Sequence, residues 1–190
     1  DLAVLEKGIT LVIFALMILI GLESFKALKR LMQNRILQKK AYLDAATGLP
    51  NKNRCEEILD APVSLDMGVV SFDLNDLRRI NNSRGHEVGD VYSRRFATAL
   101  RAAVPEEHFV GRFGGDEFIV ILSDSEVSDM NKIIATLNEN IRAINQGSNS
   151  IQISYAVGKA HTSCYVGNVT MKVLFERADY DMYQNKLADK

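Results

Sequence analysis

Hydrophobic positions along this chain follow two different patterns. Residues 9–22, ITLVIFALMILIGL, form a nearly unbroken apolar run, which predicts a helix that is apolar on all sides. From residue 44 onward, apolar residues recur in short groups with helical or strand spacing, separated by Gly, Pro and Asn. This second pattern is typical of one packed α/β domain. We therefore divide the chain into residues 1–22, 23–43 and 44–190.

The apolar run has nearly the length that a membrane span requires. Its fourteen residues would cover about 21 Å of a hydrocarbon core that is about 30 Å thick. Extension back to Leu2 reaches about 31 Å but encloses Glu6 and Lys7, whose long side chains can reach an interface. A signal peptide and a buried helix of the domain are the alternatives, although no small-residue cleavage site follows. We expect residues 1–22 to be a transmembrane helix with a truncated start.

The segment 23–43 is strongly basic. It carries six Lys or Arg residues against Glu23 alone, a net charge of +5. Dense positive charge directly after an apolar span marks the cytoplasmic side of a membrane helix, and this favours the membrane interpretation. The segment has no Gly or Pro, and apolar residues recur at helical spacing: Phe25, Leu28, Met32 and Ile36. It predicts a linker or signalling helix, either solvated or paired in a coiled coil.

The remaining residues predict elements in the order α-β-α-α-β-β-α-β-α. Helices are expected from about residue 52 and over 75–82, 88–103, 130–144 and 171–186, with strands over 66–73, 108–112, 117–122 and 151–158. Strands 108–112 and 117–122 form a hairpin, in which Gly114-Gly115 is expected to supply positive φ angles. A hairpin excludes a purely parallel sheet. We expect an α+β fold with helices over an antiparallel-rich sheet.

Composition narrows the function classes. With 47% hydrophobic and 25% charged residues, the chain is neither disordered nor of low complexity. The net charge of −1 favours no nucleic-acid partner. The two cysteines, Cys55 and Cys164, fit neither a disulfide framework nor a zinc site, and we interpret both as reduced, packed thiols.

One candidate site lies where the first strand of the domain ends. Asp73 closes the strand and Leu74 follows it. A carboxylate beside a freed backbone carbonyl is a suitable ligand pair for a hard cation. The alternative is that Asp73 or Asn75 only caps the next helix.

A second candidate site lies at the tip of the hairpin. Asp116 and Glu117 directly follow Gly114-Gly115. One interpretation is that two adjacent acids on a turn have no role beyond forming a solvated loop. The other is functional: glycines let a phosphate approach the backbone, where the two acids could hold Mg²⁺. If the two strands are neighbours, Asp73 and Asp116 meet at one edge of the sheet. Two-metal phosphoryl transfer requires such an arrangement of carboxylates.

These residues belong to a set of motifs in a fixed order. Residues 114–118 read GGDEF and residues 72–90 read FDLNDLRRINNSRGHEVGD. They are accompanied by TGLPN at 47–51, and by ISYAVGKA and ADYDMYQNK nearer the C-terminus. From Asp44 to Lys190 the chain resembles the GGDEF domains, the diguanylate cyclases.

The resemblance implies a fold and an activity. The family fold is a five-stranded, mostly antiparallel sheet wrapped by helices, related to nucleotide-cyclase and polymerase palm domains. The family condenses two GTP molecules into cyclic di-GMP, one GTP being bound by each protomer of a head-to-head homodimer. We therefore expect GTP as substrate and no nucleic-acid partner. The N-terminal helix would place the protein in the inner membrane of a bacterium, with the catalytic domain in the cytoplasm.

The resemblance also implies a metal site. Asp73, the carbonyl of Leu74, and Asp116 would hold Mg²⁺, for which Mn²⁺ could substitute. Asp116 would in addition accept the proton of the 3′-hydroxyl group. Glu117 would contribute to the metal and to the electrostatics of catalysis.

Three residues would recognise the base. By resemblance, Asn81 and Asp90 read the guanine edge, where a carboxylate suits the N1–H and amino donors, and His86 lines the same pocket. The alternatives are structural: a turn around Gly85 for Asn81 and His86, and a helix N-cap for Asp90.

The phosphates would meet glycines and cations. Gly114 and Gly115 would let the substrate approach the backbone. Arg78 replaces the family's Lys at the catalytic, phosphate-facing position, and Lys186 and Lys190 occupy the family positions for the terminal phosphates. Lys190 replaces an Arg and loses bidentate geometry.

Three departures from the family pattern lie outside these positions. Asn75, Leu77 and Asn82 replace Asp, Phe and Asp respectively. Because the metal and guanine positions are intact, the resemblance implies an active diguanylate cyclase. The alternative is a catalytically weak GTP-binding domain that acts as a regulatory or dimerisation module.

Overall fold

The computed structural model describes residues 2–63, 66–147, 151–165, 167 and 169–188. Contacts divide the chain into two units, residues 1–41 and residues 42–190.

The first unit is a single long helix. Helix α1 (Leu2–Tyr42) continues without a break through the expected membrane and linker segments. Its 41 residues extend about 61 Å, roughly twice the thickness of a hydrocarbon core. Its described large apolar side chains are exposed, as in Leu11 at 74% and Phe14 at 64%. By length and composition alone, the stretch Lys7–Gln38 could cross a membrane.

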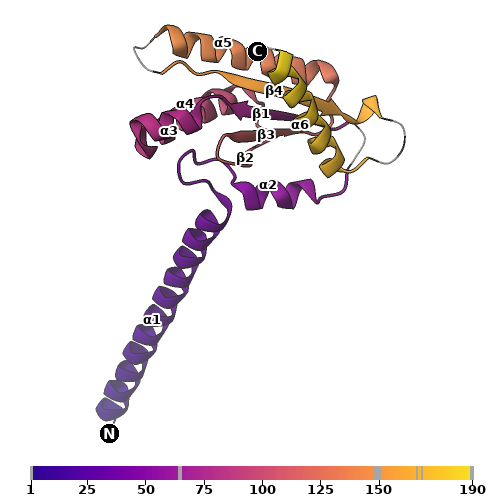
Figure 1. Ribbon diagram of the computed structural model, residues 1–190. Coiled ribbons are helices and arrows are strands. Elements are labelled where there is room, and N and C mark those ends of the chain that lie inside the picture. The colour runs from indigo at the N-terminus through magenta and orange to yellow at the C-terminus, as the bar shows by residue number, and fades with distance from the viewer. Residues whose placement is uncertain (1, 64–65, 148–150, 166, 168, 189–190) are drawn as a thin grey trace. The chain divides into compact units, whose positions relative to one another are not determined.

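The second unit is built on an antiparallel sheet (Figure 1). Its strands are β1 (Gly68–Leu74), β2 (Phe109–Arg112), β3 (Glu117–Leu122) and β4 (Tyr155–His161), in the order β2-β3-β1-β4. The expected fold class is confirmed, but the expected number of five strands is wrong: the described residues form four. The central strand β1 pairs with both β3 and β4, so its C-terminal end lies between two neighbours.

Helices cover both faces of this sheet. Helices α2 (Lys52–Leu59) and α6 (Met171–Ala188) pack on the face that carries Val69 of β1. Helices α3 (Leu77–Arg84), α4 (His86–Ala103) and α5 (Val127–Gln146) pack on the face of Val70 and Phe72. A short 3₁₀ turn, η1 (Thr162–Cys164), follows β4. The alternation along β1 places apolar residues on both faces because both are buried.

An aromatic cluster fixes the position of α4 over the sheet. Phe96 of α4 meets Phe118 of β3 edge-on, with ring centroids 4.9 Å apart, and Phe72 of β1 at 6.1 Å. All three are fully buried. Buried aromatic side chains contribute large apolar areas and specific geometry. The cluster therefore holds the middle of α4 and the β1–β3 pair in a defined relation.

Two elements start three or more residues away from the position that the sequence predicts. The strand expected over 151–158 begins only at Tyr155, because the side chain of Asn145 bonds both the N–H of Ile153 (2.9 Å) and its carbonyl (2.8 Å). Those backbone groups are therefore satisfied by α5 instead of by a strand. Helix α5 begins at Val127, three residues early, because Glu126 and Asp129 form a capping box.

The two cysteines differ in environment. Cys55 is buried and its burial raises the pKa of the thiol to about 12. It packs so closely under Gly111 that an added Cβ there would lie 2.4 Å from Sγ. Cys164 is exposed, so the expectation of two packed thiols is wrong for this residue; both are free.

Candidate active site

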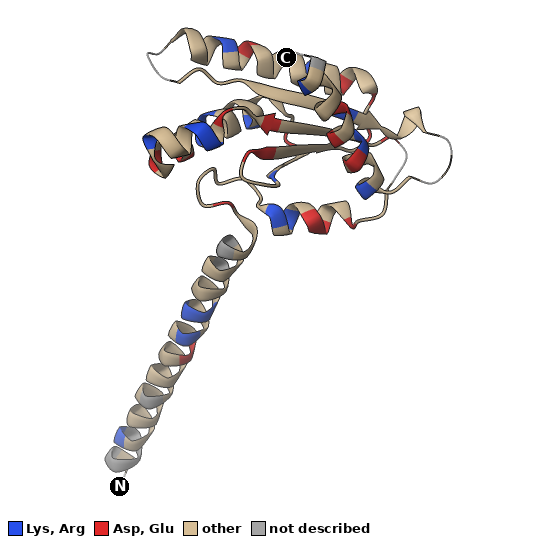
Figure 2. Ribbon diagram, in the orientation of Figure 1, with Lys and Arg blue, Asp and Glu red and all other residues tan. Residues whose placement is uncertain are grey.

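The acidic residues singled out in the sequence meet at one edge of the sheet. In the β1–β3 register, Asp73 lies directly opposite Glu117. The N–H of Leu74 donates to the carbonyl of Asp116 at 2.7 Å, which extends the pairing into the turn. Figure 2 shows acidic residues at the end of β1 and at the start of β3. Strand pairing therefore brings together residues that are forty-three positions apart in the chain.

The hairpin turn closes by a different mechanism from the one expected. Neither Gly114 nor Gly115 adopts a positive φ. The amides of Phe113 and Gly114 both donate to the carbonyl of Glu117, at 2.8 and 3.2 Å. Gly114 is needed for space, because an added Cβ would lie 2.5 Å from Oε2 of Glu117. The glycine thus lets the Glu117 carboxylate fold back over the turn.

A pocket of about 590 Å³ opens between β1, α3, α6 and the hairpin. Five of the residues predicted for the site line it: Asp73, Leu74, Arg78, Asp116 and Lys186. The prediction missed the others: Asp76, Leu77, Arg79, Asn82 and Ser83. Cationic and anionic side chains thus face one cavity. A nucleoside triphosphate with a bound metal ion requires both, because cations bind its phosphates and carboxylates bind the metal ion.

Among the missed residues, Asp76 and Arg79 form an ion pair. The Asp76 carboxylate accepts from Nε of Arg79 at 3.1 Å and pairs with its Nη2 at 3.1 Å. Asp76 is also the N-cap position of α3, with φ of +62°. The sequence signal that could have found this pair is their three-residue spacing at a helix start. The N-cap at Asp76 also shows that Asp73 and Asn75 do not cap this helix.

Asp73 instead forms an ion pair with Lys186 of α6. Nζ of Lys186 lies 2.6 Å from Oδ1 of Asp73, and the two side chains are 38% and 19% exposed. The pair joins residues 113 positions apart. Lys190, the other cation expected at the terminal phosphates, lies outside the described residues.

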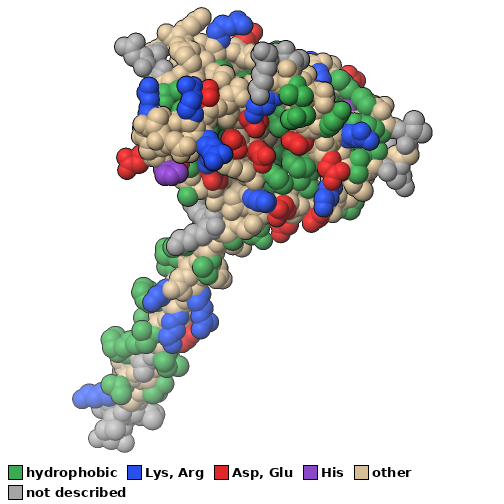
Figure 3. Space-filling model, viewed as in Figure 1, with side chains coloured by type: hydrophobic (Ala, Val, Ile, Leu, Met, Phe, Trp, Pro, Cys, Tyr) green, Lys and Arg blue, Asp and Glu red, His purple; other side chains and the backbone are tan. Residues whose placement is uncertain are grey.

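The electrostatics of this edge suit a cation. Partial burial raises the pKa of the Glu117 carboxyl, and the negative charges of Asp116, Asp179 and Asp73 raise it further. Figure 3 shows acidic side chains gathered on this face of the domain, with Lys and Arg side chains around them. The described residues hold no group of three or more His, Cys, Asp or Glu side chains already arranged around a metal position. The carboxylate and carbonyl oxygens of this edge are nevertheless the donor types that a hard cation prefers. One of them, Oδ1 of Asp73, already binds a cation, the ammonium group of Lys186.

The residues expected to read the base lie on α3 and α4 and are not among the residues that line this pocket. Oδ1 of Asn81 is buried and has no hydrogen-bond partner. It lies against Gly89 of α4, where an added Cβ would be 1.8 Å away. His86 and Asp90 are exposed on the first turns of α4.

Of the structural alternatives for these residues, the turn around Gly85 is present, whereas the N-cap role of Asp90 is not. Gly85 does break the chain between the two helices, with φ of +86°. Its N–H donates to the carbonyl of Asn81 at 3.0 Å, which leaves the Asn81 side chain for another role. Helix α4 begins at His86, so Asp90 lies within the helix and is not its N-cap.

Comparison with known proteins shows the family to which this chain belongs. The sequence profile of the family described as "Diguanylate cyclase, GGDEF domain" matches residues 41–190. The chain is 30% identical over 159 residues to the diguanylate cyclase DgcP of Pseudomonas aeruginosa, covering 80% of this chain and 24% of DgcP. It is 29% identical over 173 residues to the diguanylate cyclase DgcZ of Escherichia coli, covering 87% of this chain and 57% of DgcZ. This chain belongs to the GGDEF diguanylate cyclase domain family.

Solved structures show the same fold. The coiled coil and GGDEF domain of DgcB from Caulobacter crescentus superposes with a TM-score of 0.71 at 20% identity, covering 88% of this chain and 93% of that chain. The GGDEF domain of TpbB from Pseudomonas aeruginosa gives a TM-score of 0.67 at 27% identity, covering 77% and 90%. The chain spans about a quarter of DgcP and a little over half of DgcZ.

Proposed function

We propose that this chain is an active diguanylate cyclase, which condenses two GTP molecules into cyclic di-GMP and two diphosphates. The observation that carries the proposal is the convergence of Asp73, Asp116 and Lys186 on one pocket at the sheet edge. Arg78 on the same pocket adds a further cation for phosphate. The buried, unpartnered acceptor of Asn81 supports recognition of a base that presents N–H donors, as guanine does.

The residues of this chain divide the work of the reaction. Asp73, the Leu74 carbonyl and Asp116 would hold Mg²⁺ or Mn²⁺, with Glu117 adding negative charge; the metal would stabilise the attacking and leaving oxygens. Asp116 accepts the proton as the 3′-oxygen of one GTP attacks the α-phosphorus of the other. The bond from that phosphorus to the β-phosphate bridging oxygen breaks, and diphosphate leaves. The same step on the second GTP closes the ring.

Substrate binding uses the surrounding groups. Arg78, Lys186 and Lys190 would neutralise the triphosphate. Gly114 and Gly115 leave the backbone at the turn accessible to it. His86 and Asp90 on α4 would complete the base site with Asn81. Lys186 must then exchange Asp73 for a phosphate oxygen when the site is loaded.

Two chains must cooperate, because each attacking hydroxyl belongs to the other GTP. We propose a homodimer with facing sites, anchored by residues 1–22 of α1 in the inner membrane of a bacterium, with the catalytic domain in the cytoplasm. The length of α1, about 61 Å, supports this, since the apolar run accounts for only part of it and the basic segment 23–43 extends beyond. Residues 44–190 would form the catalytic domain.

The test is product formation from GTP. The full chain with GTP and Mg²⁺ should yield cyclic di-GMP by chromatography, and Asp116→Asn should lose this activity by at least about 100-fold while keeping wild-type circular dichroism. Asp124→Asn is the matched control, because Asp124 is a loop acid that follows β3 and does not line the pocket. GTP binding by the wild type without turnover would instead support the weak GTP-binding regulatory module.

A further inference from the structure

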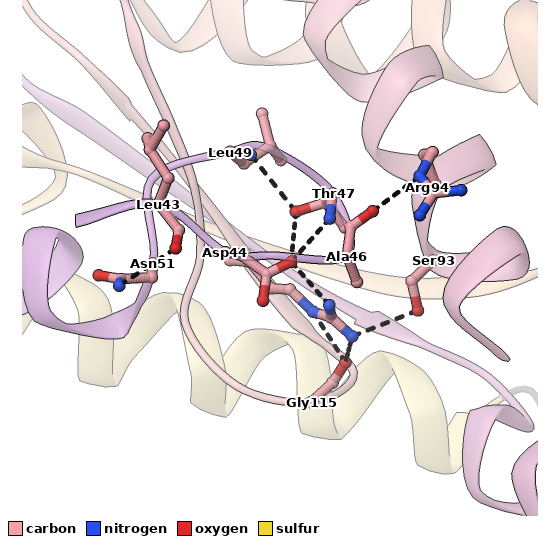
Figure 4. A network of polar contacts seen from close by, with 10 residues as sticks. Leu43, Asp44, Ala46, Thr47, Leu49, Asn51, Ser93, Arg94 and Gly115 are labelled. Carbon is pink, nitrogen blue, oxygen red and sulfur yellow. Dashed lines mark hydrogen bonds and ion pairs between the residues drawn. The ribbon is translucent and has the colours of Figure 1, made fainter. Parts of the chain in front are cut away.

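Arg112 is the last residue of β2, and its side chain is only 10% exposed. Its guanidinium group contacts three separate parts of the domain, and Figure 4 labels the partners Asp44, Ser93 and Gly115. One part is Asp44, in the turn after α1; another is Ser93 on α4; the third is the carbonyl of Gly115 in the hairpin. The guanidinium also lies 5.7 Å from the centre of the Phe118 ring. A guanidinium group with this little exposure and this many fixed partners has little freedom to reorient.

At the first contact, Asp44 is itself held in place. Its Oδ1 accepts from the N–H of Thr47 at 2.9 Å, from the Thr47 hydroxyl at 2.7 Å and from Nη1 of Arg112 at 2.8 Å. Burial alone would raise the pKa of Asp44, but the hydrogen bonds from Thr47 and Arg112 outweigh it and lower the pKa. Asp44 is therefore an ionised, rigid partner that fixes one side of the guanidinium fork.

At the hairpin contact, Arg112 acts on the backbone that carries Asp116. Nε and Nη2 of Arg112 both donate to the carbonyl of Gly115, at 3.1 and 2.6 Å. That carbonyl belongs to the peptide plane before Asp116. The peptide plane after Asp116 is held by β1, because its carbonyl accepts from the N–H of Leu74 at 2.7 Å. With both planes fixed, φ and ψ of Asp116 are set, and with them the direction of its Cα–Cβ bond, from which the carboxylate extends.

We propose that Arg112 is a positioning residue for Asp116, and that Asp44 makes this positioning depend on the turn that directly follows α1. The inference rests on the proposed function. Among the described residues, Arg112 does not line the pocket, and its side-chain hydrogen bonds go to Asp44, Ser93 and Gly115 instead of to a base-reading residue. Its effect on chemistry would pass through the Gly115 carbonyl. A change in the turn after α1 would reach Asp116 through one guanidinium group.

The experiment compares two arginines that bond the same turn. Arg94 of α4 donates to the carbonyl of Ala46 at 2.8 Å, and no contact of Arg94 with the hairpin is recorded among the described residues. Arg94→Gln is therefore the matched control for Arg112→Gln. Arg112→Lys keeps the charge but lacks the fork that bridges Asp44 and Gly115. Asp44→Asn removes the negative charge that pairs with Arg112. This variant tests the same link if the Arg112 variants fold poorly.

Two readouts separate positioning from a general loss of stability. The first is amide hydrogen exchange at Leu74, whose N–H bonds the Asp116 carbonyl; it should accelerate at least about tenfold in Arg112→Gln and stay unchanged in Arg94→Gln. The second is the split between kcat and KM in the full chain. Arg112→Gln and Arg112→Lys should lower kcat by about 10- to 100-fold with little change in KM for GTP, since a displacement of about 1 Å has such an effect.

The network also predicts non-additivity. Asp44→Asn should lower kcat, and the double variant Asp44→Asn/Arg112→Gln should be no worse than Arg112→Gln alone, because both changes remove the same link. Equal Leu74 exchange in Arg112→Gln and Arg94→Gln would overturn the inference, as would a loosened hairpin with unchanged kcat. If the wild type makes no cyclic di-GMP, the proposed function fails, while the Leu74 exchange still decides whether Arg112 holds the hairpin.

Discussion

Gly89→Ala offers a test of base recognition that leaves the chemistry of every site residue unchanged. Gly89 is a buried residue of α4. A Cβ at this position would lie 1.8 Å from Oδ1 of Asn81 and 2.9 Å from its Cγ. Ordinary carbon contacts require about 3.5 Å, so the carboxamide must move by more than about 1 Å. Because it ends a flexible side chain, it can rotate away without unfolding the domain.

The expected loss follows from the state of Asn81. Its Oδ1 is buried and unpartnered, so in the proposed complex it gains one hydrogen bond from the guanine edge. Such a bond contributes about 0.5–1.5 kcal/mol, which corresponds to about a 2- to 13-fold rise in KM for GTP. Rotation of the Asn81 carboxamide also exposes its unpaired oxygen to solvent in the free protein, which stabilises the free state relative to the complex. The rise in KM should therefore lie near the upper end of this range. Ala in place of a helical Gly contributes up to about 1 kcal/mol of stability, which offsets the local crowding.

The assay measures the rate of cyclic di-GMP formation against GTP concentration, together with competition by ATP. Gly89→Ala should raise KM about tenfold and reduce the preference for GTP over ATP, with kcat changed much less. Gly147→Ala is the control, since its added Cβ would make only an ordinary contact at 3.5 Å. Unchanged KM and unchanged discrimination in Gly89→Ala would refute the placement of Asn81 against the base.

Three further predictions concern the metal site, pH and association. Lys186→Gln frees the Asp73 oxygen that the Lys186 ammonium occupies at 2.6 Å. Calorimetry without nucleotide should therefore show tighter Mg²⁺ binding than in the wild type, while KM for GTP rises. The same Mg²⁺ affinity in variant and wild type would contradict the exchange of Asp73 for a phosphate oxygen. Because the folded-state pKa of Glu117 is raised above 4.5, its stabilising contribution is complete below pH 4.5 and is lost as pH rises through the folded value. Glu117→Gln should therefore raise the metal-free Tm at pH 7 but not at about pH 4. An equal rise of Tm at both pH values would show that the gain does not come from removing the Glu117 charge. Removal of residues 1–43 should give a domain whose specific activity rises with concentration and is restored by a fused parallel coiled coil, whereas identical activity at all concentrations would argue against helix-driven pairing.

The sequence alone was sufficient for the order of elements and for the family. Apolar spacing predicted each α-helix and strand described in the domain, because buried faces impose their period on the chain, but it did not predict the 3₁₀ turn η1. The motif at residues 114–118 and the run at 72–90 identified the GGDEF family before any distance was known. The meeting of Asp73 with the hairpin acids also followed from the sequence, once their strands were taken as neighbours.

Other features depended on side chains that are distant in the chain. The strand expected from Ile151 begins at Tyr155, because Asn145 of another element bonds Ile153. Gly114 serves to make room for Glu117 and not to provide a positive φ. Such effects have no periodic signature, since they arise from one close contact in the folded domain.

The tertiary structure alone decided which groups hold one another. Lys186 bonds Asp73 across 113 positions, and Arg112 joins Asp44 to Gly115. The sequence places suitable charges on separate elements but does not say which of several cations will meet which carboxylate. That choice depends on how α6, the turn after α1 and the hairpin pack around the sheet, because an ion pair forms only where packing brings its partners within about 4 Å.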